Sequence, residues 1–298
     1  MNSINDLIDN DLRINLNQQF AAIIGSNPSK GARSPSLWNA AFKGRKLPIR
    51  MIPLDVSPQN LPTLLSKLSE LPTFIGGAVA VPHKNTVAEF LSNSITSESL
   101  HIGAVNSLFR TNNGQLYGTN TDGEASLIAL RNQVGDISGK NILILGAGGA
   151  AKAVASYMSN GVGPKGKVFV ASRDPSRFFY FKEKLKVEDV IDWSQISSFI
   201  SKSNIIINCT SIGSELSIDQ SPLSDQQLEL CQEDMFIYDI IYQPRPTLFL
   251  KKSKQNGLKT LDGLNMNLEQ AVLAFTYAMR NQIDHIEIDE IRGFMLSS

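Results

Sequence analysis

A run of glycine and alanine between an apolar segment and a helical pattern has the composition of a phosphate-binding turn. Residues 141–145 predict a buried strand, and residues 150–158 predict the helix that follows. A glycine turn at such a junction brings a dinucleotide pyrophosphate to the positive N-terminus of the helix. The residues of this turn that we expect to bind a cofactor are Gly146, Ala147, Gly148, Gly149 and Ala150.

Two polar segments in the first half of the chain could supply acid–base chemistry. Lys84 follows Pro82 at the end of a predicted strand, and Asp122 lies in a polar turn before a predicted helix. Ligands bind at the carboxyl ends of strands in open parallel sheets. A lysine and an aspartate that meet there would form a proton-transfer pair, because the carboxylate fixes the ammonium group. Taken alone, Lys84 also fits a solvated surface charge, and Asp122 also fits a helix cap.

Basic residues follow the second strand after the glycine turn, which we expect at 167–171. An NAD-specific site has an acidic residue at this strand tip to bind the ribose hydroxyls. Here Ser172 and Arg173 stand at the tip and Arg177 follows, and guanidinium groups suit the 2′-phosphate of NADP. Asp174 allows two interpretations, a helix N-cap or a ribose ligand that would admit NAD. We favour the cap and therefore expect NADP as the cofactor, with NAD as the alternative.

Strand and helix patterns alternate along most of the 298 residues. This alternation is typical of α/β proteins whose parallel sheets are covered on both faces by helices, and the length suits two domains. We expect an N-terminal α/β substrate-binding domain at 19–123, completed by closing helices within 264–298. A C-terminal Rossmann dinucleotide-binding domain is expected at 124–263, with a helix over 175–185.

The composition narrows the class of partner. The chain has 28 basic and 28 acidic residues, no run of Lys or Arg, and no apolar run that reaches the length of a membrane span. Its N-terminus lacks the basic and apolar segments of a signal peptide. We therefore expect a cytoplasmic protein, a monomer or homodimer, that binds a small molecule and neither nucleic acid nor membrane. The scattered histidines and two cysteines predict no metal site.

Several short motifs, in this order, resemble those of the shikimate dehydrogenase family, which includes quinate/shikimate dehydrogenases. The resemblance runs from about residue 22 to about residue 275. Besides the glycine turn, the motifs are Asn27-Pro28 with Ser34-Pro35, Val81-Pro82-His83-Lys84, Gly103-Ala104-Val105-Asn106, Asn120-Thr121-Asp122-Gly123, Asn208-Cys209-Thr210-Ser211, Tyr238-Asp239 with Tyr242, and Asp262-Gly263-Leu264 with Gln270.

The resemblance implies hydride transfer between NADP and a ring hydroxyl or ketone in a step of aromatic amino acid biosynthesis. The ring acid would be shikimate with 3-dehydroshikimate, or a close analogue such as quinate or aminoshikimate. Lys84 has the position of the family's catalytic lysine and Asp122 that of its partner. The residues that match substrate-contacting positions are Ser34, Asn106, Tyr242 and Gln270. Those that match further cofactor-contacting positions are Thr210, Ser211, Ile240 and Gly263.

Three alanines stand where the family usually has hydrogen-bonding side chains. Ala32 replaces the first serine of Ser-x-Ser-Pro, and Ala78 and Ala80 replace the polar residues of Asn-Val-Thr-Val-Pro. Loss of a buried hydrogen bond to a substrate can cost orders of magnitude in specificity. The sequence therefore leaves two alternatives for the substrate: shikimate or quinate, or a ring acid with different substituents. Our hypothesis is that Lys30, Arg33 or an ordered water binds the substrate carboxylate in place of the missing serine hydroxyl.

A second class of function is also open on these residues, a non-catalytic nucleotide- or metabolite-binding module with the same fold. The three alanines support it. Lys84 and Asp122 favour the enzyme, because a sensor would not need a proton-transfer pair.

Overall fold

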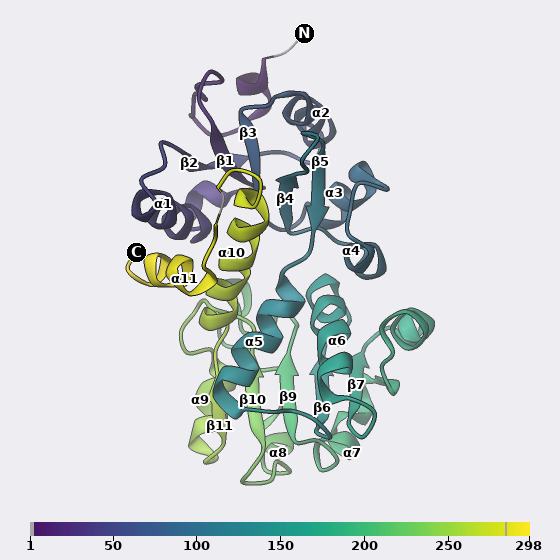
Figure 1. The fold of residues 1–298 in the computed structure, drawn as a ribbon. Coiled ribbons are helices and arrows are strands. Elements are labelled where there is room, and N and C mark those ends of the chain that lie inside the picture. The colour runs from purple at the N-terminus through teal and green to yellow at the C-terminus, as the bar shows by residue number, and fades with distance from the viewer. Residues whose placement is uncertain (1–2, 284) are drawn as a thin grey trace. The chain divides into compact units, whose positions relative to one another are not determined.

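The computed structural model describes residues 3–283 and 285–298 and divides the chain into two compact units. The first unit ends at Thr121 and is completed by the residues from Gln270 onward; the second unit is Asp122–Glu269. Each unit has one sheet with helices on its two faces, so the chain has the expected two-domain α/β fold (Figure 1). The second unit differs by a few residues at each end from the expected range 124–263.

The sheet of the first unit is mixed, so the expectation of wholly parallel sheets is wrong here. Its strands, in spatial order, are β2 (Arg50–Asp55), β1 (Phe20–Gly25), β3 (Phe74–Val79), β4 (Ser107–Arg110) and β5 (Leu116–Thr119). β1 pairs in parallel with β2 and β3, whereas β4 runs antiparallel to both β3 and β5. Only residues 111–115 join β4 to β5. So short a connection permits a hairpin and not a parallel crossover.

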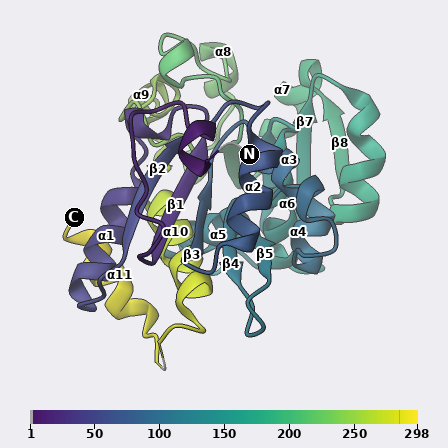
Figure 2. The ribbon, with the colours of Figure 1, turned by 90° about the horizontal axis from the view of Figure 1, so that it is seen from above.

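Alternate residues of β1 point to different helices of the first unit. Ala22 and Ile24 belong to the hydrophobic cluster that includes the leucines of α2. On the other face, Trp38 of α1 packs on Phe275 of α10 with ring centroids 5.2 Å apart. α1 and α10 thus cover one face and α2 and α3 the other, which Figure 2 shows from above. The helices are η1 (Ile4–Leu7), η2 (Pro28–Lys30), α1 (Ser34–Gly44), α2 (Leu61–Glu70), α3 (Lys84–Leu91), α4 (Ser97–Ile102), α10 (Leu264–Met279) and α11 (Ile288–Leu296). The part of α10 that precedes Gln270 belongs to the second unit.

The six strands of the second unit are all parallel. In spatial order they are β11 (Lys259–Leu261), β10 (Phe236–Asp239), β9 (Ile205–Asn208), β6 (Asn141–Leu145), β7 (Lys167–Ser172) and β8 (Asp189–Asp192). Numbered within this unit from β6 and read from β8 to β11, the order is 3-2-1-4-5-6, that of the dinucleotide-binding fold. The strand order reverses between β6 and β9, and ligands bind outside the carboxyl ends of the strands at such a point.

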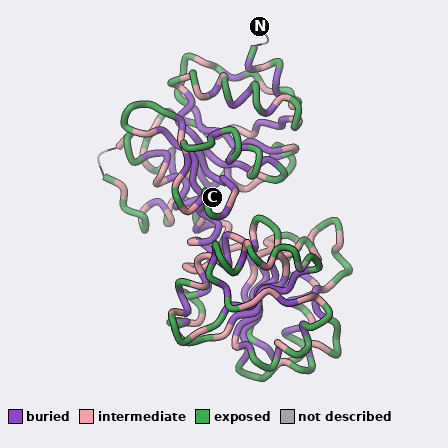
Figure 3. The backbone as a smooth tube through the Cα atoms, turned by 90° about the vertical axis from the view of Figure 1, so that its right-hand side faces the viewer, coloured by how far each residue is buried: buried purple, intermediate pink, exposed green. Residues whose placement is uncertain are grey.

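Helices cover both faces of this second sheet, and its strands are the most buried part of the unit (Figure 3). The residues of α7, α8 and α9 join one face of the sheet in a single hydrophobic cluster, while α5 packs against α6. The helices are α5 (Asp122–Val134), α6 (Gly149–Val162), η3 (Pro175–Arg177), η4 (Tyr180–Lys184), η5 (Trp193–Gln195), α7 (Ile196–Ile200), η6 (Glu215–Ser217), α8 (Asp225–Leu228) and α9 (Leu248–Gln255).

The helix expected over 175–185 is broken, which corrects the sequence-based expectation. A 3₁₀ turn at η3 is followed by a short π-helical segment at η4. The consecutive aromatic residues 178–181 do not have the 3.6-residue period of an amphipathic helix. Phe181 is fully buried, whereas Phe179 is 73% exposed. Among all the described residues, no helix is both long enough and apolar enough to cross a membrane.

Candidate active site

The two glycines at the start of the turn in the second unit differ in how closely other atoms surround them. Gly146 has φ of +106°, and a Cβ there would lie 2.9 Å from the Thr210 side chain. At Gly148, a Cβ would have no heavy atom of the described chain within 4 Å except its immediate neighbours. The fold therefore requires Gly146, whereas the bare backbone at Gly148 offers close approach to a ligand.

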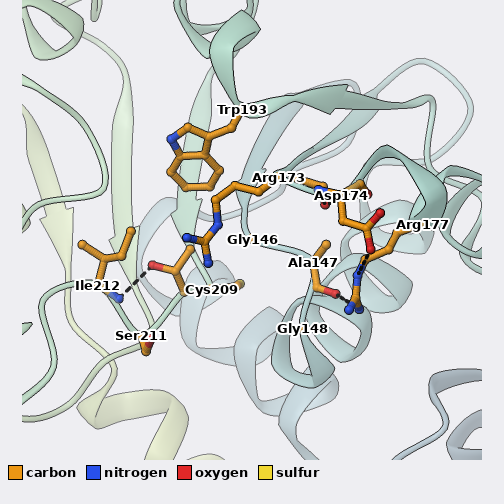
Figure 4. Close-up of a pocket in the computed structure, with 12 residues that line it drawn as sticks. Gly146, Ala147, Gly148, Arg173, Asp174, Arg177, Trp193, Cys209, Ser211 and Ile212 are labelled. Atoms are coloured by element: carbon orange, nitrogen blue, oxygen red, sulfur yellow. Dashed lines mark hydrogen bonds and ion pairs between the residues drawn. The ribbon is translucent and has the colours of Figure 1, made fainter. Parts of the chain in front are cut away.

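A pocket of about 330 Å³ lies beside this turn at the carboxyl ends of β6, β7, β8 and β9 (Figure 4). Its lining combines the glycine turn with the residues that follow the three other strands. It is lined by Gly146, Ala147, Gly148, Ser172, Arg173, Asp174, Arg177, Trp193, Cys209, Thr210, Ser211 and Ile212. Trp193 and Ile212 were not among the expected site residues, and Trp193 could have been found only by recognising β8 as a strand.

Asp174 and Arg177 interact with each other at the rim of this pocket. One carboxylate oxygen of Asp174 accepts hydrogen bonds from the N–H of Ser176 at 3.1 Å and from its hydroxyl at 2.6 Å. The other accepts from Nε of Arg177 at 3.3 Å. These bonds, led by that from the Ser176 hydroxyl, hold the pKa of Asp174 below its ordinary value. The contacts agree with the interpretation of Asp174 as a cap.

The hydroxyls of two expected cofactor residues are used to shape loops. Ser172 is buried, and its Oγ accepts from the N–H of Asp174 and donates to the carbonyl of the same residue, both at 3.0 Å. Thr210 Oγ1 donates to Asn208 Oδ1 at 2.7 Å and accepts from the N–H of Ile212 at 3.0 Å. Both side chains therefore fix the walls of the pocket that they line.

A third cation lies near the glycine turn. Lys152 is in the second turn of α6, and its Nζ lies 3.9 Å from the centroid of the Tyr180 ring. Burial, and secondarily the positive charge of Arg177, lowers the pKa of Lys152. With Arg173 and the N-terminus of α6, these residues form a positive region suited to phosphate groups.

Ile240 and Gly263, both expected to contact the cofactor, pack directly on each other. A Cβ at Gly263 would lie 2.0 Å from the carbonyl oxygen of Ile240. The N–H of Gly263 also donates to the carbonyl of Ile241 at 3.2 Å. Tyr242, a half-buried residue, follows directly. The glycine is therefore required by the approach of two backbone segments.

In the first unit, Lys84 is the first residue of α3 and does not end a strand, which corrects the sequence-based expectation. β3 already ends at Val79, and the segment between them contains a turn. The carbonyl of Lys84 accepts a hydrogen bond from the N–H of Val105 at 2.9 Å. This bond joins the start of α3 to the residue that precedes Asn106.

Asn106 organises the carboxyl end of the first sheet. Its side chain accepts from the N–H of Thr121 at 2.8 Å, and its Nδ2 donates to Thr121 Oγ1 at 3.1 Å. Thr121 Oγ1 donates in turn to the carbonyl of Gln270 at 3.1 Å. Hydrogen bonds through Thr121 thus connect Asn106 to the backbone carbonyl of Gln270. The backbone carbonyl of Lys84 is bonded to Val105, the residue next to Asn106. Asp122, buried and the first residue of α5, follows Thr121 directly in the chain.

The residues at the ends of β1 and β3 are small. Ala78 is almost fully buried, and the N–H of Ala80 donates to the carbonyl of Ile24 at 2.8 Å. A Cβ at Gly25 would lie 3.0 Å from the Cβ of Ala80, so the backbones approach closely here. Ser34 is buried at the first position of α1. Nowhere in residues 3–283 and 285–298 do three His, Cys, Asp or Glu side chains gather as metal ligands would.

Two family models match the chain, one in each half. Residues 23–108 match the model described as the shikimate dehydrogenase substrate binding domain. Residues 129–266 match the model described as shikimate / quinate 5-dehydrogenase. The chain belongs to the shikimate dehydrogenase family.

Individual members of this family are similar over nearly their whole length. The shikimate dehydrogenase (NADP(+)) of Microcystis aeruginosa is 34% identical over 267 residues, which cover 88% of this chain and 91% of the relative. A crystal structure of a shikimate dehydrogenase in complex with NADP+ has a TM-score of 0.81 and 29% identity, covering 96% of this chain and 97% of that chain. The Thermus thermophilus enzyme in complex with NADP(H) and shikimate has a TM-score of 0.76 and 27% identity, covering 94% of this chain and 99% of that chain.

Proposed function

We propose that this member of the shikimate dehydrogenase family is an NADP-dependent oxidoreductase that interconverts 3-dehydroshikimate and shikimate. The observation that carries the proposal is the match of both halves of the chain to models of this family. The relatives named shikimate dehydrogenase (NADP(+)) support the reaction and the cofactor. They do not favour the alternative of a non-catalytic binding module.

The pocket of the second unit fits the adenosine and phosphate part of NADP. The open backbone at Gly148 and the N-terminus of α6 would hold the pyrophosphate. Arg173 and Arg177 would hold the 2′-phosphate, whose two charges a guanidinium can bind in a bidentate manner. When bound, NADP supplies the hydride acceptor of the reaction. Ile240, Gly263, Thr210 and Ser211 complete the cofactor-binding set in this proposal.

In the substrate-binding part of the proposal, Lys84 and Asp122 handle the proton of the reacting ring hydroxyl. Lys84, as the neutral amine, takes that proton when the hydroxyl becomes a ketone, and the resulting ammonium returns it in the reverse direction. The role that we propose for Asp122 is to orient this lysine. Asn106 and Gln270 lie in the same network of short contacts as the backbone of Lys84, which supports a shared role. Ser34 and Tyr242 are the remaining substrate contacts that we propose.

A spectrophotometric assay of NADP reduction tests this function directly. Shikimate, quinate and aminoshikimate are supplied separately to the purified protein. We expect turnover with shikimate, with a KM higher than that of family members that have polar residues at positions 32, 78 and 80, because the alanine side chains there cannot form hydrogen bonds to the ring acid. Binding of NADPH with no turnover of any of the three acids would overturn the proposal in favour of a binding module.

A further inference from the structure

One wall of the nucleotide pocket is formed by the indole of Trp193. This residue comes directly after β8, and its side chain lines the pocket with Arg173 and Ile212 (Figure 4). β8 lies next to β7, the strand whose end leads to Arg173. The aromatic ring and the guanidinium therefore come from neighbouring strand ends of the same sheet.

The position of Trp193 is fixed from two sides. The preceding residue, Asp192, caps η5: its side chain accepts from the N–H of Ser194 at 2.9 Å, and its own N–H donates to the Gln195 side chain at 3.2 Å. The indole is only partly buried and packs against the hydrophobic cluster that includes Phe169 and Ile191. The ring is thus supported by the core while it also lines the pocket, so little ordering is needed when a ligand binds.

The chemistry of the pocket changes from one side to the other (Figure 4). Trp193 and Ile212 lie on one side, Asp174 and Arg177 lie on the other, and the side chain of Arg173 extends between them. A purine base has flat faces that stack on aromatic rings and guanidinium groups, whereas a phosphate needs cations and N–H donors. An adenosine phosphate likewise has a flat base at one end and a charged phosphate at the other.

We propose that Trp193 stacks on the adenine of NADP beside Arg173, an inference that rests on the proposed function. Trp193 is then a binding residue for the base, while Arg177 recognises the 2′-phosphate. Loss of the indole therefore lowers the affinity for every adenine nucleotide by the same factor. Loss of Arg177 lowers the affinity only for nucleotides that carry the 2′-phosphate.

Tryptophan fluorescence reports this contact without any catalytic turnover. The chain has two tryptophans, and the other, Trp38, is fully buried in the first unit against Phe42 and Phe275. Adenosine 2′,5′-bisphosphate, which lacks the nicotinamide, is titrated into the wild-type protein. We expect the emission to fall to the level contributed by Trp38. In Trp193→Phe the titration leaves the tryptophan emission unchanged.

Calorimetric affinities separate the base from the phosphate. We expect Trp193→Ala to raise the Kd of adenosine 2′,5′-bisphosphate and that of 5′-AMP equally, by about tenfold, since stacking of one base is lost. Trp193→Phe keeps most of the affinity, because a phenyl ring still stacks. Arg177→Ala raises the Kd of the bisphosphate and leaves that of 5′-AMP unchanged. Circular dichroism checks that each variant folds. If Trp193→Ala does not fold, the comparison of Trp193→Phe with the wild type tests the stacking proposal.

Two other outcomes are informative. Wild-type affinity for both probes in Trp193→Ala, or tight binding without quenching in the wild type, would overturn the stacking proposal and leave the dehydrogenase function intact. If the wild-type protein binds neither NADPH nor the bisphosphate, the proposed function is overturned, and the stacking proposal with it.

Discussion

Arg177 donates a hydrogen bond from Nη1 to the carbonyl oxygen of Ala147 at a distance of 3.0 Å. The loop after β7 is thereby joined to the glycine turn after β6. The same guanidinium pairs with Asp174, yet 46% of the Arg177 side chain is exposed. One residue therefore connects both sides of the pocket rim and still presents N–H groups to a ligand.

Arg177→Ala should change the choice of cofactor. We expect kcat/KM with NADP to fall by about 10- to 100-fold, since a charged hydrogen bond to the 2′-phosphate is lost, and kcat/KM with NAD to change little. Steady-state kinetics with both cofactors measure the ratio. Asp174→Asn is the matched control: it keeps the cap on Ser176, so the NADP preference should persist. Loss of NAD activity alone in Asp174→Asn would instead identify Asp174 as a ribose ligand.

Two glycine substitutions should have opposite effects. Gly148→Ala adds a methyl group that meets no described atom within 4 Å, apart from those of its neighbours, so its melting temperature should equal that of the wild type while its Kd for NADPH rises. Gly263→Ala directs a methyl group to within 2.0 Å of the Ile240 carbonyl oxygen and should destabilise the second unit. Thermal unfolding and NADPH titration distinguish the two. Equal NADPH affinity in Gly148→Ala would show that the pyrophosphate lies elsewhere.

Lys84→Met should remove the proton-transfer group and keep much of the side-chain volume. We expect kcat to fall by about 100- to 10,000-fold, which is the usual contribution of general acid–base catalysis. The Kd for NADPH should stay unchanged, because the proposed nucleotide site lies in the second unit. Lys43→Met, at an exposed position of α1, controls for the loss of a lysine and should have wild-type activity. Full activity of Lys84→Met would refute the assigned role.

Arg110 is a buried arginine whose hydrogen bonds all go to backbone carbonyls. Its guanidinium donates to Phe74, at 2.7 Å, and to four other carbonyl oxygens, those of Leu68, Ser69, Leu71 and Gly114. Three of these carbonyls lie at or just after the last turn of α2, where a cation is favourable. Burial lowers the pKa of Arg110.

Arg110→Met should therefore destabilise the first unit. We expect the free energy of unfolding to fall by about 2–4 kcal/mol, because several buried carbonyl groups lose their donor. Urea unfolding followed by circular dichroism measures it. Arg50→Met, at an exposed position in β2, should change stability by less than about 0.5 kcal/mol. A similar loss in both variants would mean that the carbonyl contacts are not the cause.

The elements that the sequence predicts best are those with a local signal. The apolar run 141–145 is β6, the helical period over 264–279 is α10, and the glycine turn between strand and helix lies where expected. Each depends on periodicity or on a turn residue within a few positions. Asp174 is similar, since a cap acts on residues two or three positions away.

Features that depend on strand order could not be predicted in this way. Trp193 lines the pocket because β8 lies beside β7, a relation that no local pattern contains. The antiparallel β4 depends on the shortness of its link to β5, and β5 itself has only four residues, Leu116–Thr119. Lys84 begins a helix because β3 ends early, at Val79. In each case tertiary pairing outweighs the local preference.

Asp239, at the end of β10, is a buried carboxyl group with three donors. Asn208 Nδ2 and the N–H of Ile241 donate to one oxygen at 3.0 and 3.1 Å, and Thr247 donates to the other at 2.7 Å. These bonds lower its pKa, but burial has the larger effect and raises the pKa from 3.8 to about 6. The folded protein therefore binds this proton more tightly than the unfolded chain does.

The consequence is a loss of stability as pH rises. Between about pH 4 and about pH 6 the folded state retains a proton that the unfolded state has released, so this group's contribution falls across that window, in total by on the order of 3 kcal/mol. Asp239→Asn does not ionise and keeps an oxygen for Asn208 and Ile241. We expect its free energy of unfolding, relative to wild type, to rise from about pH 4 to about pH 7 in urea titrations. Asp136→Asn is the control of opposite sign, because hydrogen bonds from Ser138 lower the pKa of that exposed carboxyl group. Parallel pH profiles for Asp239→Asn and wild type would exclude a raised pKa at Asp239.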